Sequence, residues 1–246
     1  GCRKVHFSGG EPALRPDLPE IVAHARRLKL RVTLTTNGTL LTRGLSRRLV
    51  KAGLNGVCGS LDSPVRAVHD RLRGMPGALK ATLAGVSHLR AAAEEGGSAL
   101  AIRVNTVVSR ESYATLDRLP ALLHEIGARS LLLLPVDDPS GDLLLNKRRL
   151  QDYHERIAPV LAEQGLALGL LRHAREAYPF GVTHDEWADC RDGRYARGLY
   201  ERQPCYAPWT HALVAADGHV APCCSAPRVT LGNLIESRFP EIWQGE

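Results

Sequence analysis

Short, almost continuously apolar runs alternate with segments whose apolar residues recur every three or four positions over the first two thirds of the chain. Continuous apolar runs are typical of parallel strands that helices cover, and the wider spacing predicts helices. The runs predict strands at 4–7, 31–35, 56–61, 99–108, 130–134 and 166–171. The predicted helices cover 17–28, 45–52, 79–89, 116–126 and 150–164. This alternation predicts an α/β fold built as an open or closed barrel of parallel strands.

The start of the first predicted helix carries a local signal. Asp17 and Glu20 stand three positions apart ahead of its apolar stripe, which predicts a capping-box-like beginning. Residues 137–145 separate the fifth predicted strand from the next helix and have no apolar period, so we expect a loop there.

The pattern changes after residue 172. Residues 173–204 are rich in charged residues, tyrosine and glycine and lack a clear period, which predicts a linker. Asp217-Gly218 then lies between apolar runs at 211–215 and 219–220, a strong signal for a β-hairpin. The sequence therefore predicts an α/β barrel domain over 1–172, a linker over 173–204 and a small hairpin module over 205–246.

Composition and charge limit the classes of protein to which the chain can belong. Its 246 residues are 44% hydrophobic and 24% charged, which is typical of a globular protein. Neither a membrane-length apolar run nor a signal-peptide pattern is present, so we expect a cytoplasmic protein with no membrane partner. The net charge of +6 comes from arginines such as Arg26-Arg27, Arg47-Arg48 and Arg148-Arg149, without interleaved aromatics. Solvated helix faces explain this pattern better than an anionic substrate, and nucleic acid is the weakest explanation.

Polar residues gather where predicted strands give way to loops, and in parallel α/β folds those carboxyl ends line the ligand site. The two glycines of Gly9-Gly10 let the backbone approach a small molecule, and Glu11 offers an anionic acceptor for an amine. Arg103 and Asn105 differ by two, so both point to the same face of their strand. The candidate residues are Ser8, Gly9, Gly10, Glu11, Thr36, Asn37, Ser60, Asp62, Arg103 and Asn105.

Each of these residues also has an ordinary structural interpretation. Asn37-Gly38 is a common turn, Ser60 a common cap and Asn105 a common core amide. Asp62, together with Asp137 and Asp138, suits a proton acceptor but equally a helix cap or a solvated loop acid. The functional interpretation depends on the whole set lying together.

The six cysteines include a cluster near the C-terminus. Without an export signal, such a cluster favours a metal over disulfides. The predicted hairpin brings Cys205 and Cys223 to the same end, which suits zinc or an iron–sulfur cluster. Cys58 lies in mid-strand and Cys2 before the first strand, so we interpret both as ordinary thiols.

These motifs together resemble the radical S-adenosylmethionine (radical SAM) enzymes that carry a C-terminal auxiliary-cluster module, known as a SPASM or twitch domain. Ser8-Gly9-Gly10-Glu11-Pro12 matches the methionine-binding motif of the family. Thr36-Asn37-Gly38, Ser60-Leu61-Asp62 and Arg103–Val107 look like its later cofactor-contacting strand ends. Cys205, Gly218 and Cys223 fit the opening signature of the module, and 232–234 with 241–243 resemble its next segment.

The resemblance implies a partial (β/α)6 TIM-like barrel that lacks its first strand–helix unit. It implies that Glu11 and Gly9-Gly10 hold the methionine ammonium, whereas Ser60, Arg103 and Asn105 contact the carboxylate or ribose. It also implies a [4Fe–4S] cluster, an auxiliary [4Fe–4S] cluster and a 5′-deoxyadenosyl radical that modifies a peptide or small metabolite. An electron donor such as flavodoxin or ferredoxin would complete the system, with no nucleic-acid partner.

The sequence departs from the family in two places. The Cys-x3-Cys-x2-Cys motif that ligates the radical-generating cluster is absent, and Cys2 is wrongly placed to replace it. The cysteines that complete the auxiliary cluster are also absent, which leaves Cys205 and Cys223, with Cys190 and Cys224 as possible substitutes. The only methionine is Met75, so we expect a piece of a longer protein. We predict that the chain as given does not cleave S-adenosylmethionine.

Two alternatives stay open. The barrel could be a non-catalytic protein that binds S-adenosylmethionine or a peptide after losing the radical cluster. The cysteines of the hairpin could instead form a structural zinc site.

Overall fold

The computed structural model describes residues 1–191, 204–224, 226 and 228–245. The chain divides into two compact units, 1–195 and 196–246, and each is described by itself. No helix among the described residues is long and apolar enough to cross a membrane.

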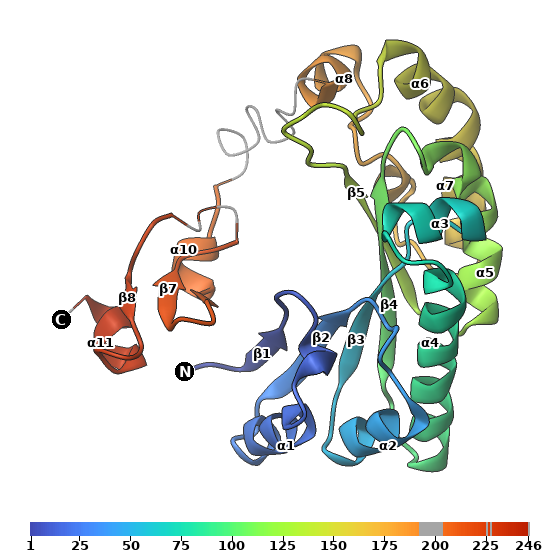
Figure 1. Ribbon diagram of the computed structural model, residues 1–246. Helices are drawn as coiled ribbons and strands as arrows, with labels where there is room; N and C mark the ends of the chain where they lie inside the picture. The colour runs from blue at the N-terminus through green and yellow to red at the C-terminus, as the bar shows by residue number, and fades with distance from the viewer. Residues whose placement is uncertain (192–203, 225, 227, 246) are drawn as a thin grey trace. The chain divides into compact units, whose positions relative to one another are not determined.

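The first unit is built on a five-stranded parallel sheet (Figure 1). Its strands follow the order of the sequence, so each pairs with the next: β1 (Lys4–Phe7), β2 (Arg31–Thr36), β3 (Gly56–Ser60), β4 (Ala101–Val108) and β5 (Ser130–Pro135). The predicted strands of the first unit are therefore confirmed with one exception. Parallel order brings all five carboxyl ends to one edge of the sheet.

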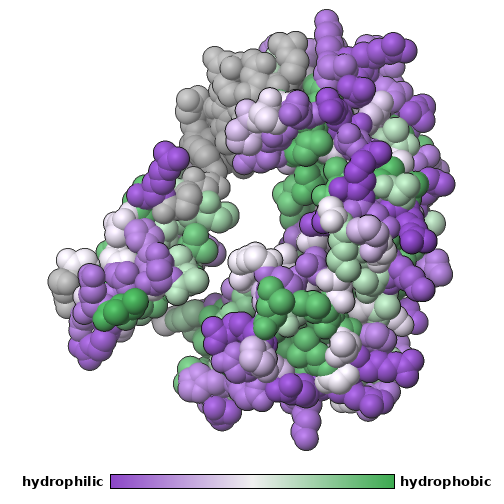
Figure 2. Space-filling model, viewed as in Figure 1, coloured by the Kyte–Doolittle hydropathy of each residue, from purple (hydrophilic) through white to green (hydrophobic). Residues whose placement is uncertain are grey.

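Helices connect the strands and cover one face of the sheet (Figure 1). They are η1 (Pro12–Leu14), α1 (Leu18–Arg27), α2 (Arg43–Lys51), α3 (Arg66–Leu72), α4 (Ala78–Glu95), η2 (Tyr113–Arg118), α5 (Leu119–Glu125), α6 (Lys147–Asp152), the π-helical turn η3 (Tyr153–Ile157), α7 (Ala158–Ala167), η4 (Ala174–Ala177) and α8 (His184–Arg191). Hydrophilic residues cover much of their outer surface (Figure 2).

Alternation along each strand decides which side chains face the helices. Val32 and Leu34 of β2 are fully buried in a core with α1 and α2, and Leu131 and Leu133 of β5 lie in a second core with α5 and α7. The intervening residues of each strand therefore point to the opposite face, which we call the open face.

The strand predicted at 166–171 is wrong. Helix α7 continues to Ala167, and the chain then reverses at Gly169, whose φ is 67°. The amides of Leu170 and Leu171 both donate to the carbonyl of Gly165, at 2.8 and 3.0 Å. One bond, from the Leu131 amide to the Leu170 carbonyl at 2.9 Å, joins this segment to β5. Leucines at alternate positions, which predicted a strand, belong to the end of α7 and the turn after it.

The predicted capping box of α1 is also wrong. The carboxylate of Asp17 accepts from Arg15, with Nε–Oδ1 and Nη2–Oδ2 distances of 3.0 and 2.7 Å, and makes no capping bond. Glu20 instead pairs with Arg48, at 2.9 Å. The bidentate pair of Asp17 with Arg15 is stronger than a capping bond to a helix amide, because both groups of the pair are charged.

Part of the segment predicted as a linker packs on the first unit. It contains η4 and α8, and Ala177 and Phe180 are buried in the core with Tyr153. The hydroxyl of Tyr153 donates to the Ala177 carbonyl at 2.7 Å. The predicted linker residues 192–203 lie outside the described residues.

The second unit contains a three-stranded antiparallel sheet of β6 (Leu213–Val214), β7 (His219–Ala221) and β8 (Gly232–Asn233). Two short helices, α10 (Ala207–Thr210) and α11 (Phe239–Gln244), flank it. Strands β6 and β7 form a hairpin around Asp217-Gly218, where Gly218 has a φ of 83° and Asp217 accepts from the His219 amide at 3.1 Å. Strand β6 is shorter than the predicted 211–215.

Candidate functional site

Glu11 connects the loop after β1 to the end of β2. Its Oε1 accepts from the Ala13 amide at 3.0 Å and from the Thr36 hydroxyl at 2.6 Å, while Oε2 accepts from the Asn37 amide at 2.7 Å. A carboxylate oxygen can accept two hydrogen bonds, so Oε2 retains one acceptor position. Three predicted site residues, Glu11, Thr36 and Asn37, are thus in direct contact.

The glycines before Glu11 present bare backbone. Gly9 has a φ of 118°, which side-chain-bearing residues rarely adopt, and both glycines are exposed. A Cβ built on Gly9 or Gly10 would meet no atom within 4 Å, so open space borders this strand end. Ser8 is also exposed here.

The end of β2 forms a local turn. The Asn37 side chain accepts from the amide and hydroxyl of Thr39, at 2.9 and 2.7 Å. Its backbone carbonyl accepts from the Thr82 hydroxyl on α4 at 2.7 Å. Asn37 therefore has a structural role as a turn residue. The turn fixes the position of its own backbone amide, which donates to Glu11.

Strand register places further predicted residues side by side on the open face. One row across the sheet contains Thr35, Cys58, Arg103 and Ser130, and the next row contains Ser60, Asn105 and Leu132. The Nε of Arg103 donates to the Ser130 hydroxyl at 3.4 Å. A guanidinium, two hydroxyls and an amide therefore occupy neighbouring positions on β3, β4 and β5.

Asn105 contains a buried acceptor without a partner. Its Oδ1 is inaccessible to solvent and accepts no hydrogen bond from the described residues. A buried polar atom of this kind costs free energy unless a ligand or water satisfies it. The open face thus offers a donor-bearing ligand a ready acceptor beside Ser60.

Asp62 differs from the other candidates because its carboxylate is already occupied within the protein. Its side chain is 9% exposed, pairs with Arg73 at 2.8 Å and accepts from the Val107 amide at 3.1 Å. The Asp62 amide donates to Nδ1 of His69, at 3.2 Å, and burial lowers the pKa of His69 below its ordinary value. This cluster fixes the end of β3 to α3 and β4.

Several residues of the open face were not predicted from the sequence. Nδ1 of His6 lies 2.8 Å from the Thr33 hydroxyl, and its Nε2 lies 2.9 Å from that of Thr35. Leu132 and Leu134 of β5 are 39% and 38% exposed, which leaves an apolar strip next to Asn105. Two-residue alternation along the predicted strand at 130–134 would have placed Leu132 and Leu134 on this face, whereas the contacts of His6 depend on the register of β1 against β2.

The cysteines of the second unit remain a prediction. Cys205 and Cys224 are exposed and Cys223 is half-buried. Within the described part of the chain, no three His, Cys, Asp or Glu side chains form a group that would hold a metal. The side chain of Cys190 lies outside the described residues.

Two family models match the chain. Residues 1–99 match the Radical SAM superfamily, and residues 205–246 match SPASM, an iron–sulfur cluster-binding domain. The chain therefore carries a radical SAM domain over residues 1–99 and a SPASM domain over residues 205–246.

Its curated relatives match nearly the whole chain. The PqqA peptide cyclase of Gluconobacter oxydans is 30% identical over 254 residues, which cover 99% of this chain and 63% of the relative. An AdoMet-dependent heme synthase of Methanosarcina barkeri is 28% identical over 264 residues, which cover 97% and 67%. The chain thus spans about three fifths to two thirds of the length of these relatives.

Solved structures show the same fold. SuiB of Streptococcus suis bound to S-adenosylmethionine aligns with a TM-score of 0.66 and 18% identity over 98% of this chain and 53% of its own. The protein anSMEcpe with bound AdoMet aligns with a TM-score of 0.63 and 18% identity over 98% and 67%. These matches confirm an α/β TIM-like fold.

The two domains bring the cofactors of the family, which are S-adenosylmethionine and [4Fe–4S] clusters that include an auxiliary cluster. The described residues fit S-adenosylmethionine. Asn105 offers an unpaired acceptor, Arg103 a guanidinium for a carboxylate, and Oε2 of Glu11 a free acceptor position for an ammonium.

Proposed function

We propose that this chain is the S-adenosylmethionine-binding part of a radical SAM enzyme that modifies a peptide or a small metabolite. The curated relatives include a PqqA peptide cyclase and heme synthases, so a peptide and a tetrapyrrole are the substrate classes to test first. SuiB, of similar fold, was solved with its precursor peptide SuiA, which supports the peptide class.

Two groups of residues would bind the two ends of the cofactor. Glu11 and the backbone of Gly9-Gly10 would hold the methionine ammonium at the end of β1. Ser60, Arg103 and Asn105 would hold the carboxylate or ribose on the open face. A carboxylate at one end and a guanidinium at the other suit a zwitterion.

When bound, a reduced [4Fe–4S] cluster would supply the one electron that cleaves S-adenosylmethionine to methionine and a 5′-deoxyadenosyl radical. The chain's own residues would bind and orient the cofactor. Cys205 and Cys223 would contribute to the auxiliary cluster of the SPASM domain, with Cys190 and Cys224 as possible further ligands. An electron-donor protein such as flavodoxin or ferredoxin would supply the reductant.

The unpartnered Oδ1 of Asn105 carries the proposal, because it lies on the face where strand register also gathers Ser60 and Arg103. The full-length protein should be reconstituted anaerobically and incubated with S-adenosylmethionine and dithionite. Chromatography should then detect 5′-deoxyadenosine. A fully loaded cluster that yields none would contradict the enzyme class.

A non-catalytic binding protein is the second candidate, motivated by the absence of a Cys-x3-Cys-x2-Cys motif from residues 1–246. The reading frame upstream of Gly1 distinguishes the two. A Cys-x3-Cys-x2-Cys motif just before Gly1 would reject the non-catalytic candidate.

A further inference from the structure

The positive charge of the chain is concentrated at its beginning. Residues 1–53 contain eleven Lys and Arg against three Asp and Glu, which gives them +8 in a chain whose total is +6. The remaining residues are therefore slightly acidic. Such an asymmetry points to a localised interaction surface rather than to general solubility.

The fold gathers seven of these cations at the amino-terminal edge of the sheet, which is the edge opposite the candidate site. Lys4 pairs in register with Arg31, and the Arg31 amide donates to the Arg3 carbonyl at 2.9 Å. The ends of α1 and α2 that lead into β2 and β3 lie at this same edge (Figure 1). We call this surface the basic edge, and its members are Arg3, Lys4, Arg26, Arg27, Lys29, Arg31 and Lys51, all exposed.

Side-chain contacts connect the helix ends within the basic edge. Arg26 donates to the Leu30 carbonyl at 2.7 Å. The same side chain lies over the turn after α2, because a Cβ on Gly53 would be 3.1 Å from it. The basic edge is therefore continuous from α1 to the end of α2.

The cations of the basic edge have no acidic partners among the described residues. Other arginines nearby do, since Arg47 pairs with Glu95 at 3.0 Å and Arg48 with Glu20 at 2.9 Å. A solvated helix face usually intersperses both signs of charge. The lack of compensation at the basic edge favours an anionic partner.

Lys29 provides a second, independent observation. Its φ is 60°, and it is the one non-glycine residue with positive φ among those described. It lies just beyond α1, where glycine is the common residue because a Cβ is strained in this conformation. Lys29 thus adds a cation to the basic edge at a position where glycine would be free of this strain.

We propose that the basic edge binds an acidic polypeptide segment. Leu28 lies between Arg27 and Lys29, is 60% exposed and offers such a segment one apolar contact. Nucleic acid is a poorer fit, because stacking needs exposed aromatic rings and Phe7, the only aromatic residue within 1–53, packs against the core. A membrane would need more apolar anchors than Leu28 alone.

The test uses the 246-residue chain without S-adenosylmethionine, so its outcome is independent of the proposed radical chemistry. Fluorescence anisotropy should monitor the binding of labelled octaglutamate at low salt and at about 0.5 M salt, with octalysine, a single-stranded RNA and phosphatidylserine vesicles as competing probes. We expect octaglutamate to bind and to dissociate at high salt.

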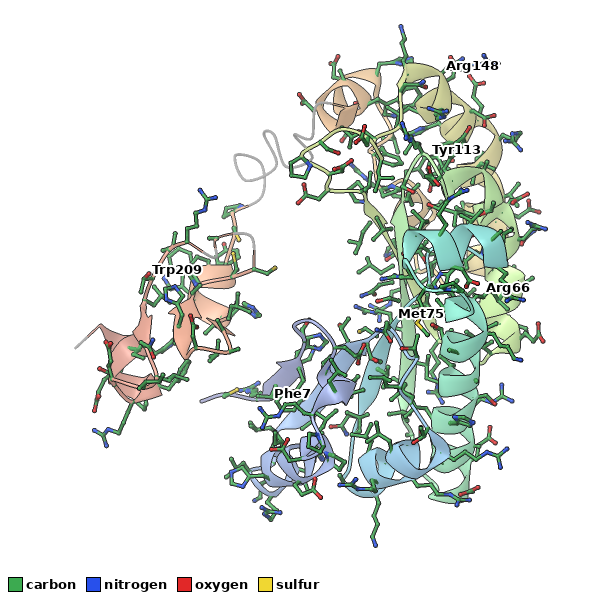
Figure 3. The ribbon with its side chains drawn as sticks, viewed as in Figure 1. Phe7, Arg66, Met75, Tyr113, Arg148 and Trp209 are labelled. Carbon is green, nitrogen blue, oxygen red and sulfur yellow. The ribbon has the colours of Figure 1, made fainter. Side chains whose placement is uncertain are left out.

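Two variants separate binding from folding. Lys29→Gly should weaken octaglutamate binding about two- to fivefold, the size of one surface ion pair, and yet raise Tm because glycine relieves the backbone strain. Arg27→Glu with Lys29→Glu should weaken it by roughly tenfold or more. The matched control is Arg148→Glu on α6 (Figure 3), which should change binding less than about twofold.

Several results would overturn the proposal. They are tighter binding of RNA or vesicles than of octaglutamate, no octaglutamate binding, or equal loss in Arg148→Glu. If Lys29→Gly binds octaglutamate as tightly as the wild type, the ammonium group of Lys29 is not part of the binding surface, which contradicts its place in the proposal.

Discussion

Replacing Glu11 with glutamine tests whether this carboxylate organises the site. Glutamine keeps the shape of the side chain but offers an NH2 group in place of one acceptor oxygen. If the NH2 group replaces Oε2, it faces the Asn37 amide, which is also a donor. If it replaces Oε1, it faces two donors, the Ala13 amide and the Thr36 hydroxyl. Thr36 could accept from this NH2 group with its second lone pair, since the first accepts from the Gly38 amide at 3.0 Å, but its own proton would then have to turn away from residue 11 and lose its partner.

The magnitude is set by the hydrogen bonds that are lost. A hydrogen bond to a charged group contributes about 1.5–3 kcal/mol, and a donor left unpaired costs about 1–3 kcal/mol. We expect Glu11→Gln to lower the free energy of unfolding by about 2 kcal/mol. For a chain of this size that corresponds to a fall in Tm of about 4–8 °C.

Urea unfolding monitored by circular dichroism measures the change. Glu20→Gln is the matched control, because Glu20 is also a glutamate with a side-chain partner, but it pairs with Arg48 and is exposed. An exposed ion pair contributes about 0–1 kcal/mol, so the control should unfold nearly as wild type. Equal unfolding curves for Glu11→Gln and the control would refute the role of Glu11 as a connecting residue.

Three further predictions concern other contacts. Asn105→Val removes a buried acceptor that has no partner among the described residues. The free energy of unfolding, measured by urea titration, should therefore stay equal or rise by up to about 1 kcal/mol. A fall in the free energy of unfolding by more than about 1 kcal/mol would mean that Asn105 is a satisfied core amide. The folded state favours neutral His69, whose pKa burial lowers, so stability should fall as pH drops through about 6.5; His69→Gln should remove that dependence between about pH 7.5 and 5.5, and an unchanged dependence would contradict it. The 246-residue chain, incubated with iron, sulfide, dithionite and S-adenosylmethionine, should yield no 5′-deoxyadenosine, because the three-cysteine motif is not in it; cleavage by this chain would overturn the prediction.

Most of the sheet could be predicted because continuous apolar strands and helical periods are local signals. The prediction failed at 166–171, where alternate leucines belong to a helix end and a turn, because period alone cannot separate these from a short strand. The capping box failed for a related reason, since Arg15 competes for Asp17 and no local pattern measures that competition.

The candidate site was predictable in part. Strand ends located Glu11, Thr36 and Asn37, which the structure brings into contact. Asp62 shows the limit of such reasoning, because its ion pair with Arg73 depends on where α3 packs. His6 was missed because its hydroxyl partners on β2 depend on strand register, which the sequence does not contain.

The central claim is that the open face holds S-adenosylmethionine, and equilibrium binding tests it most directly. The full-length protein with reconstituted clusters should be titrated with S-adenosylmethionine as wild type and as Asn105→Val. We predict an affinity at least about tenfold weaker in the variant, equivalent to about 1.4 kcal/mol, with stability unchanged or higher. Equal affinity in the two proteins would contradict the claim.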